Sequence, residues 1–115
     1  MTDISHGRGY YGESRLAKKV NGVIVGRSKA VVLPTGETIE ITHQHPPDVV
    51  NSMFAFESKY TRQFPKKISD YMLQAETNCP DGLTPVAVVK DPYRKTYYYI
   101  LRESDFVELH CGGNK

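Results

Sequence analysis

Two short apolar runs separated by small polar residues place the tightest constraint on how this chain folds. Val49-Val50 and Phe54-Ala55-Phe56 favour strands, and Asn51-Ser52 between them are residues that commonly reverse a chain. The sequence therefore predicts a tight β-hairpin with these two polar residues as its loop. In that register Val50 opposes Met53 across the hairpin.

Charged side chains lie just outside both strands of this predicted hairpin. Asp48 opposes Ala55, and because side chains alternate along a strand, Asp48 shares a face with Glu57 and Lys59. Diagonal neighbours on one face of a hairpin lie about 7–8 Å apart at the backbone. Two carboxylates at such a distance can converge on one divalent cation, so we predict a metal site on this face.

The residue types in this cluster are those that hydrolysis of a phosphodiester requires. Mg²⁺ held by one or two carboxylates keeps its other positions for water and phosphate. Asp48 and Glu57 are the predicted metal ligands, and the backbone carbonyl of Ser58 is a possible neutral ligand from the same strand. Lys59 is predicted to orient or help deprotonate the attacking water and to stabilise charge that develops on the phosphate.

A further carboxylate lies at the start of a predicted helix that runs from Glu13 to Val20. The apolar residues follow Glu13 at i+3, i+4 and i+7: Leu16, Ala17 and Val20. This spacing puts Glu13 on the inward face, where an unpartnered glutamate is rare. We therefore predict that Glu13 binds a metal or a metal-bound water; the alternative is that it complements the helix dipole. Asn21-Gly22 is expected to end the helix with a left-handed cap.

The chain between this helix and the hairpin predicts a β-ribbon. Val23 to Leu33 is rich in valine and is interrupted at Gly26-Arg27-Ser28. A turn at Pro34-Thr35-Gly36 leads into Glu37 to Thr42, which alternates as a half-buried strand does. His43 and His45 follow without cysteine partners at zinc spacing, so we expect a proline-stiffened loop in which His45 contacts substrate or bound water.

The second half of the chain predicts a helix, a second hairpin and a short helix. Pro65 opens the first helix, and its apolar stripe comprises Ile68, Met72, Ala75 and Cys79. Thr84 to Val89 is a nearly continuous apolar run and predicts a buried strand, with a turn at Lys90 to Lys95 and a returning strand at Thr96 to Leu101. Ser104 to Leu109 is expected to form a short helix that packs Phe106, Val107 and Leu109.

Length and composition predict one cytoplasmic domain over residues 1–115, with a flexible arm at 1–11 and a tail at 110–115. No apolar run reaches the ~20 residues that span a bilayer, and the start has no apolar signal-peptide segment. Cys79 and Cys111 lack zinc spacing and the density of a disulfide scaffold, so both are expected to be structural.

Basic side chains are concentrated in two segments on either side of the acidic cluster. Residues 1–29 hold six basic and two acidic side chains, and residues 59–67 hold four basic and no acidic ones. A solvated surface is one explanation; the other is a polyanion whose backbone approaches the metal site. On the second reading the predicted DNA contacts, made to phosphates without reading bases, are Arg8, Arg27, Lys29, Arg62, Lys66 and Lys67.

Together these features resemble the PD-(D/E)xK nuclease superfamily, above all its small Holliday-junction-resolvase-like endonucleases, including short phage-encoded ones. The resemblance covers about Gly12 to Leu109 and rests on Glu13, Pro47-Asp48, Glu57-Ser58-Lys59, Gln74-Ala75 and the strand Pro85 to Val89. It implies an α/β fold with a mixed central β-sheet flanked by helices, Mg²⁺ or Mn²⁺ dependence and cleavage of the DNA backbone. Asp48 and Glu57 match the metal ligands, Lys59 the catalytic lysine, Glu13 the helical carboxylate and, loosely, Gln74 an accessory residue.

Three functions remain open at this point. The first is a structure-selective endonuclease on branched DNA, which the resemblance implies is a homodimer. The second is a nicking or restriction-like nuclease on duplex or flap DNA. The third is a DNA-binding module of the same fold without catalysis. The four residues Glu13, Asp48, Glu57 and Lys59 argue against the third.

Overall fold

The computed structural model describes residues 12–42 and 44–111. The expected flexible arm, with Arg8, therefore lies outside the described residues, as do His43 and residues 112–115. The backbone contacts group into two compact units, Met1–Tyr60 and Thr61–Lys115, where chain length predicts a single domain. Each unit is described here by itself.

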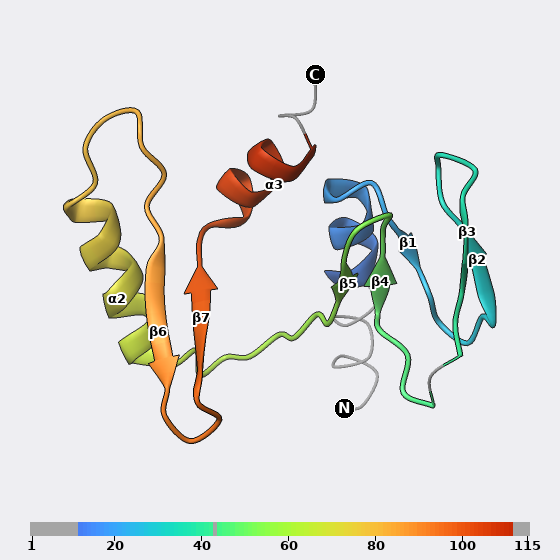
Figure 1. Cartoon of the computed structure of the whole chain (residues 1–115), viewed down its shortest axis with the longest axis horizontal. Helices are drawn as coiled ribbons and strands as arrows, with labels where there is room; N and C mark the ends of the chain where they lie inside the picture. The colour runs from blue at the N-terminus through green and yellow to red at the C-terminus, as the bar shows by residue number, and fades with distance from the viewer. Residues whose placement is uncertain (1–11, 43, 112–115) are drawn as a thin grey trace. The chain divides into compact units, whose positions relative to one another are not determined.

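The described residues contain three helices and seven strands, so the expected α/β class is confirmed at this level (Figure 1). A helix over residues 12–19 is followed by β1 (Val23–Ile24), β2 (Ala30–Val32), β3 (Thr38–Glu40), β4 (Val49–Val50), β5 (Ala55–Phe56), α2 (Lys66–Thr77), β6 (Ala87–Asp91), β7 (Thr96–Ile100) and α3 (Glu103–Cys111).

Every strand pairing among these residues is antiparallel. The strands form a three-stranded sheet in the order β1-β4-β5 and two ribbons, β2-β3 and β6-β7. The sequence predicts one mixed central sheet, and the structure has three small antiparallel sheets in its place. The strands are two to five residues long and pair mostly with their chain neighbours, as short connections allow for antiparallel strands and not for parallel ones.

The helix over residues 12–19 ends in the left-handed cap that the sequence predicts. Asn21 has a φ of 55°, and the Gly22 N–H donates to the Ala17 carbonyl at 2.8 Å, which is the 6→1 bond of a Schellman motif. A Cβ on Gly22 would lie 2.5 Å from the Val50 carbonyl oxygen. Glycine at this position therefore lets the helix end come close to the backbone of β4.

The predicted β-ribbon is confirmed and supplies most of one hydrophobic cluster of the first unit. The turn at Gly26, with a φ of 57°, separates β1 from β2. The loop between β2 and β3 closes with the Leu33 N–H donating to the Glu37 carbonyl and the Gly36 N–H donating to the Leu33 carbonyl, both at 2.8 Å. The core joins the ribbon to β4 through Val25, Val31, Leu33 and Val50, with Val23, Ile39 and Ile41 packed against them.

In the second unit α2 packs beside β6 (Figure 1). The predicted stripe of Ile68, Met72, Ala75 and Cys79 is half-buried, so its orientation is confirmed, although none of the residues of α2 is fully buried.

The strand predicted over Thr84 to Val89 is wrong in its start and in its burial. β6 begins at Ala87 and extends to Asp91, whose carboxylate accepts hydrogen bonds from the N–H groups of Tyr93 and Arg94 and so sets the turn. Only Ala87 is buried, while Val88 is 52% exposed. A two-stranded ribbon that packs α2 on one face leaves the side chains of its other face in solvent.

The last helix is longer than the sequence predicts. α3 includes His110 and Cys111, which the sequence places in the tail. Val107 is buried as expected, but Leu109 is 68% exposed. Two residues along a helix correspond to a rotation of roughly 200°, so Leu109 points away from the face that Val107 buries.

An ion pair links α2 to the residue that precedes α3. The Arg102 guanidinium donates from Nε and Nη2 to both carboxylate oxygens of Glu76, a two-point geometry that positions both side chains. The hydrogen bond from Arg102 holds the pKa of the Glu76 carboxyl below its ordinary value of 4.5.

This pair predicts a pH dependence of stability. Because the pKa of Glu76 is lower in the folded than in the unfolded chain, its contribution is present above pH 4.5 and is lost as the pH falls through the folded-state pKa. Urea unfolding of Glu76→Gln should therefore give a lower midpoint than the parent at neutral pH, and the two midpoints should converge in acid. Asp70→Asn on the same helix removes an exposed i,i+4 pair with Lys66 and should change the midpoint little. A difference for Glu76→Gln that is independent of pH would contradict the prediction.

Candidate functional site

The predicted hairpin forms, with a register two residues away from the expected one. Val50 pairs with Ala55 and Val49 with Phe56, so the loop has four residues, Asn51 to Phe54, and the predicted two-residue loop is wrong. A shift of two residues keeps each side chain on its predicted face, since the side-chain period of a strand is two. Asp48 itself lies just before β4, and Glu57 and Lys59 lie after β5, so the alternation of the strands does not by itself place their side chains.

Asn51 explains the longer loop. Its side-chain Oδ1 accepts from the N–H groups of Met53 and Phe54 at 2.9 and 2.7 Å, and its own N–H donates to the Phe54 carbonyl at 3.0 Å. Its Nδ2 donates to the Val20 carbonyl at 3.0 Å, and the residue is only 5% exposed. The sequence identifies Asn51 as a turn residue, but its bond to the end of the first helix requires the tertiary structure.

Asp48 lies at a local irregularity of the hairpin. Its N–H donates to the Phe56 carbonyl at 3.0 Å, although Phe56 pairs with Val49, so two residues of one strand face one residue of the other. This is the pattern of a β-bulge, a feature that redirects a side chain at the edge of a site. The Asp48 carbonyl accepts from the Val25 N–H at 3.0 Å, which ties the bulge to β1.

The carboxylate of Asp48 reaches across to the segment after β5 that carries Glu57. Asp48 Oδ2 accepts from the Ser58 N–H at 2.8 Å, so the carboxylate lies against the peptide that joins Glu57 to Ser58. The first helix begins at the same place, because a Cβ on Gly12 would lie 3.6 Å from Ser58 Oγ. The half-buried Glu13 follows directly, so the chain brings all four predicted catalytic positions to one end of the hairpin.

Glu57 and Lys59 form an ion pair at this end. Lys59 Nζ lies 3.3 Å from Glu57 Oε2; the Lys59 side chain is 79% exposed and that of Glu57 is 58% exposed. Such an exposed pair contributes little to stability, at about 0–1 kcal/mol. The pair keeps a flexible ammonium next to a carboxylate at low energetic cost, and both groups remain accessible to a ligand from solvent.

The predicted metal ligands supply two carboxylates, and the described protein groups do not form a complete coordination shell. Within residues 12–42 and 44–111, no group of three or more His, Cys, Asp or Glu side chains is arranged to hold a metal ion. Mg²⁺ is commonly bound by only one or two carboxylates, with water and phosphate oxygens in its other positions. The donor set of Asp48 and Glu57 fits that mode of binding and does not fit a zinc site.

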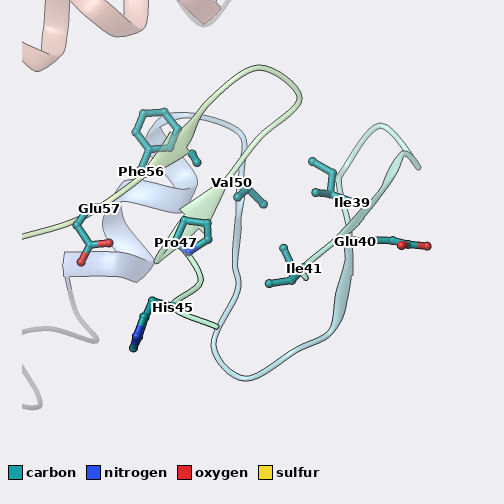
Figure 2. A pocket seen from close by; sticks show the side chains of 9 residues that line it. Ile39, Glu40, Ile41, His45, Pro47, Val50, Phe56 and Glu57 are labelled. Atoms are coloured by element: carbon teal, nitrogen blue, oxygen red, sulfur yellow. The ribbon is translucent and has the colours of Figure 1, made fainter. Parts of the chain in front are cut away.

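A hollow of about 470 Å³ opens beside the hairpin, lined by Ile39, Glu40, Ile41, His45, Pro47, Val50, Ala55, Phe56 and Glu57. Figure 2 shows His45, Pro47 and Glu57 at one end, while Glu40 points away from it. The apolar part of the lining comes from Ile39 and Ile41 of the ribbon and from Pro47, Val50, Ala55 and Phe56. The ribbon thus contributes to this surface, which the sequence alone does not indicate for Ile39 or Ile41.

The predicted DNA contacts are divided between the two units. Arg27 and Lys29 are exposed in the first unit; Arg62, Lys66 and Lys67 are exposed in the second, where Lys66 pairs with Asp70 at 2.8 Å. Gln74 is exposed on α2, and His45 is exposed in the loop before Pro47. Printed contacts join Asp48 to Ser58 and Glu57 to Lys59, and Glu13 follows the Gly12 that lies against Ser58. Within the described part of the chain, the other predicted residues are surface positions.

Comparisons of the chain with models of protein families, with curated proteins and with solved structures gave no significant match. Among the helices that the structure describes, none is long and apolar enough to cross a membrane.

Proposed function

We propose that this protein is a metal-dependent DNA endonuclease that acts preferentially on branched DNA. One observation carries the proposal: Asp48 Oδ2 accepts a hydrogen bond from the Ser58 N–H, which holds this carboxylate beside the segment after β5 that carries the Glu57 and Lys59 pair. The two carboxylates and the ammonium are thus within one short hairpin. This is the combination that cleavage of a phosphodiester requires.

Each residue has a distinct part in the proposed reaction. Asp48 and Glu57 are the residues that would hold Mg²⁺ or Mn²⁺, with the Ser58 carbonyl and Glu13 as further oxygen donors. A divalent cation bound there supplies positive charge to the phosphate and lowers the pKa of a water. Lys59 lies 3.3 Å from Glu57, where its ammonium can orient the attacking water and stabilise charge on the phosphate oxygens.

The finer parts of the proposal concern fold and assembly. The resemblance to a restriction-endonuclease-like core rests on the order helix, ribbon, acidic hairpin and helix, while the described strands form three small antiparallel sheets. The exposed basic residues Arg27 and Lys29 lie in the same unit as the hairpin and suit contacts to phosphates. A homodimer follows from the proposed substrate, because two symmetric cuts across a four-way junction need two sites related by a two-fold axis.

Cleavage of a matched set of substrates tests this function. The full-length protein is incubated with an end-labelled four-way junction, a flap, a duplex and a single strand of shared sequence, with Mg²⁺, Mn²⁺ or EDTA. Paired symmetric cuts in the junction that require a divalent cation are the expected result. Equal cutting of the duplex would support the nuclease activity and contradict the preference for branched DNA. Failure to cut any of the four substrates with either cation would overturn the proposal.

A further inference from the structure

The β6-β7 ribbon has one face that is packed and one that is open. Ala87 pairs with Ile100 and Val88 with Tyr99, so side chains of alternate residues fall on opposite faces. On one face Ala87, Val89 and Ile100 are buried or half-buried, whereas Tyr98 on the same face is exposed. We call the opposite face, formed by Val88, Lys90, Tyr97 and Tyr99, the tyrosine face; Val88, Tyr97 and Tyr99 are 52%, 58% and 71% exposed, respectively.

Three consecutive tyrosines therefore alternate between the two faces of the ribbon. Tyr98 lies on the same face as Val89 and is 45% exposed, while Tyr97 and Tyr99 lie together on the other face and are more exposed. Residues i and i+2 of a strand are about 7 Å apart along its axis, so the two rings offer separate platforms in one row. Strand propensity accounts for tyrosine in this strand, but it does not account for two exposed rings side by side on the open face.

The surroundings of these rings are positively charged. Residues 86–100 hold the basic side chains Lys90, Arg94 and Lys95 and the single acidic side chain Asp91. The Asp91 carboxylate is occupied by the N–H groups of Tyr93 and Arg94 in the turn. Lys90 Nζ lies over the Tyr97 ring, 5.5 Å from its centre, so an ammonium is in contact with this aromatic side chain.

We propose that the tyrosine face binds single-stranded DNA by stacking unpaired bases on Tyr97 and Tyr99 while Lys90 contacts a phosphate. A base stacked on an aromatic ring is held more strongly than an exposed ammonium over the same ring. A base can therefore displace Lys90 from the Tyr97 ring and leave the ammonium free to bind the backbone. Duplex DNA keeps its bases stacked and offers them no access to these rings.

A protein partner suits this face less well. The buried centres of protein interfaces are depleted in lysine, and Lys90 lies on this face directly across from Tyr97. The inference rests on the proposed nuclease function only for the biological meaning of the bound strand, which would be the unpaired bases at a branch point. The binding itself is measured without cleavage.

Fluorescence anisotropy of the full chain in EDTA, with a labelled oligo(dT) of about a dozen nucleotides, tests the proposal. Tyr97→Ala and Tyr99→Ala should each weaken binding by about 5-fold to 150-fold, the range that corresponds to one stacked base. Tyr97→Phe retains the ring and should bind within about 2-fold of the parent. Tyr71→Ala, which removes an exposed tyrosine from α2, should leave binding unchanged.

A second probe separates stacking from charge. An abasic strand of the same length keeps the phosphates and lacks the bases. The parent protein should therefore bind the abasic strand as weakly as the double variant, with both Tyr97→Ala and Tyr99→Ala, binds oligo(dT). Equal binding of the two strands to the parent would overturn the proposal. So would a loss of self-association in sedimentation by the Tyr97→Ala protein with unchanged DNA affinity, because the face would then be a protein interface.

The outcomes also distinguish this inference from the proposed function. Base-dependent binding by a parent protein that cuts no DNA would leave the tyrosine face intact and reject the nuclease. Metal-dependent cleavage by the parent, together with normal binding of single strands by the Tyr97→Ala and Tyr99→Ala variants, would support the nuclease and reject the role of the tyrosine face. Circular dichroism of each variant, together with the Tyr97→Phe protein, identifies any loss of binding that comes from unfolding.

Discussion

Lys59→Ala is expected to lower the single-turnover rate of DNA cleavage by about 100-fold to 1,000-fold, the range seen when one group that stabilises the transition-state charge is removed. Its Nζ lies 3.3 Å from Glu57 Oε2, at the end of the hairpin where Asp48 meets Ser58. The ammonium acts on charge that develops during the reaction. The variant should therefore bind branched DNA within a few-fold of the parent, when binding is measured in Ca²⁺ or EDTA.

Lys18→Ala is the matched control for this variant. Lys18 is an exposed lysine on the helix of the same unit, so the substitution removes the same charge without touching the hairpin. Its cleavage rate should stay within about 2-fold of the parent, since an exposed charge away from the reacting phosphate is largely screened by salt. An equal loss of rate for both variants would assign Lys59 to general attraction of DNA and contradict its proposed role.

Asn51→Ala is expected to lower the free energy of unfolding by about 2–4 kcal/mol, because it removes several buried hydrogen bonds and leaves the Val20 carbonyl without its partner. The amide joins the hairpin loop to the end of the first helix through Val20, Met53 and Phe54. Urea unfolding followed by circular dichroism measures the change. The same substitution should also reduce the rate of DNA cleavage, because this loop fixes the strand register that sets Asp48 across from Glu57.

Two neighbouring variants make the Asn51 prediction specific. Ser52→Ala changes the next, exposed loop residue and should remain within about 0.5 kcal/mol of the parent. Asn51→Asp keeps an oxygen for the Met53 and Phe54 N–H groups but loses the donor to Val20, so its stability should lie between the parent and Asn51→Ala. A stability of Asn51→Ala equal to that of Ser52→Ala would show that the helix and loop are held by other contacts.

Local chemistry allowed several elements to be predicted well. The cap at Asn21 and Gly22, the turns at Gly26 and Gly36 and the helix after Pro65 all form where the sequence places them. Each depends on backbone preferences and hydrogen bonds within a few residues, which are legible in a short stretch of sequence. The two hairpins were predicted for the same reason, since each joins strands that are close along the chain.

The errors have a common cause in contacts between distant residues. The bond between Asn51 and Val20 selects a four-residue loop, and no pattern near Asn51 reveals it. The exposure of Val88 depends on whether a second layer covers its face, and an apolar run alone does not say so. Leu109 was placed in the core by its chemical type, but the rotation of α3 that buries Val107 turns it to solvent.

By itself the sequence determined the α/β character and a hairpin flanked by Asp48, Glu57 and Lys59, because strand propensity and turn residues are local properties. Only the tertiary structure decided how the ends of that hairpin are held. The bulge at Asp48, its bond to Ser58 and the start of the helix at Gly12 bring these groups together. Such positions follow from packing between segments far apart in the chain, which local preferences do not encode.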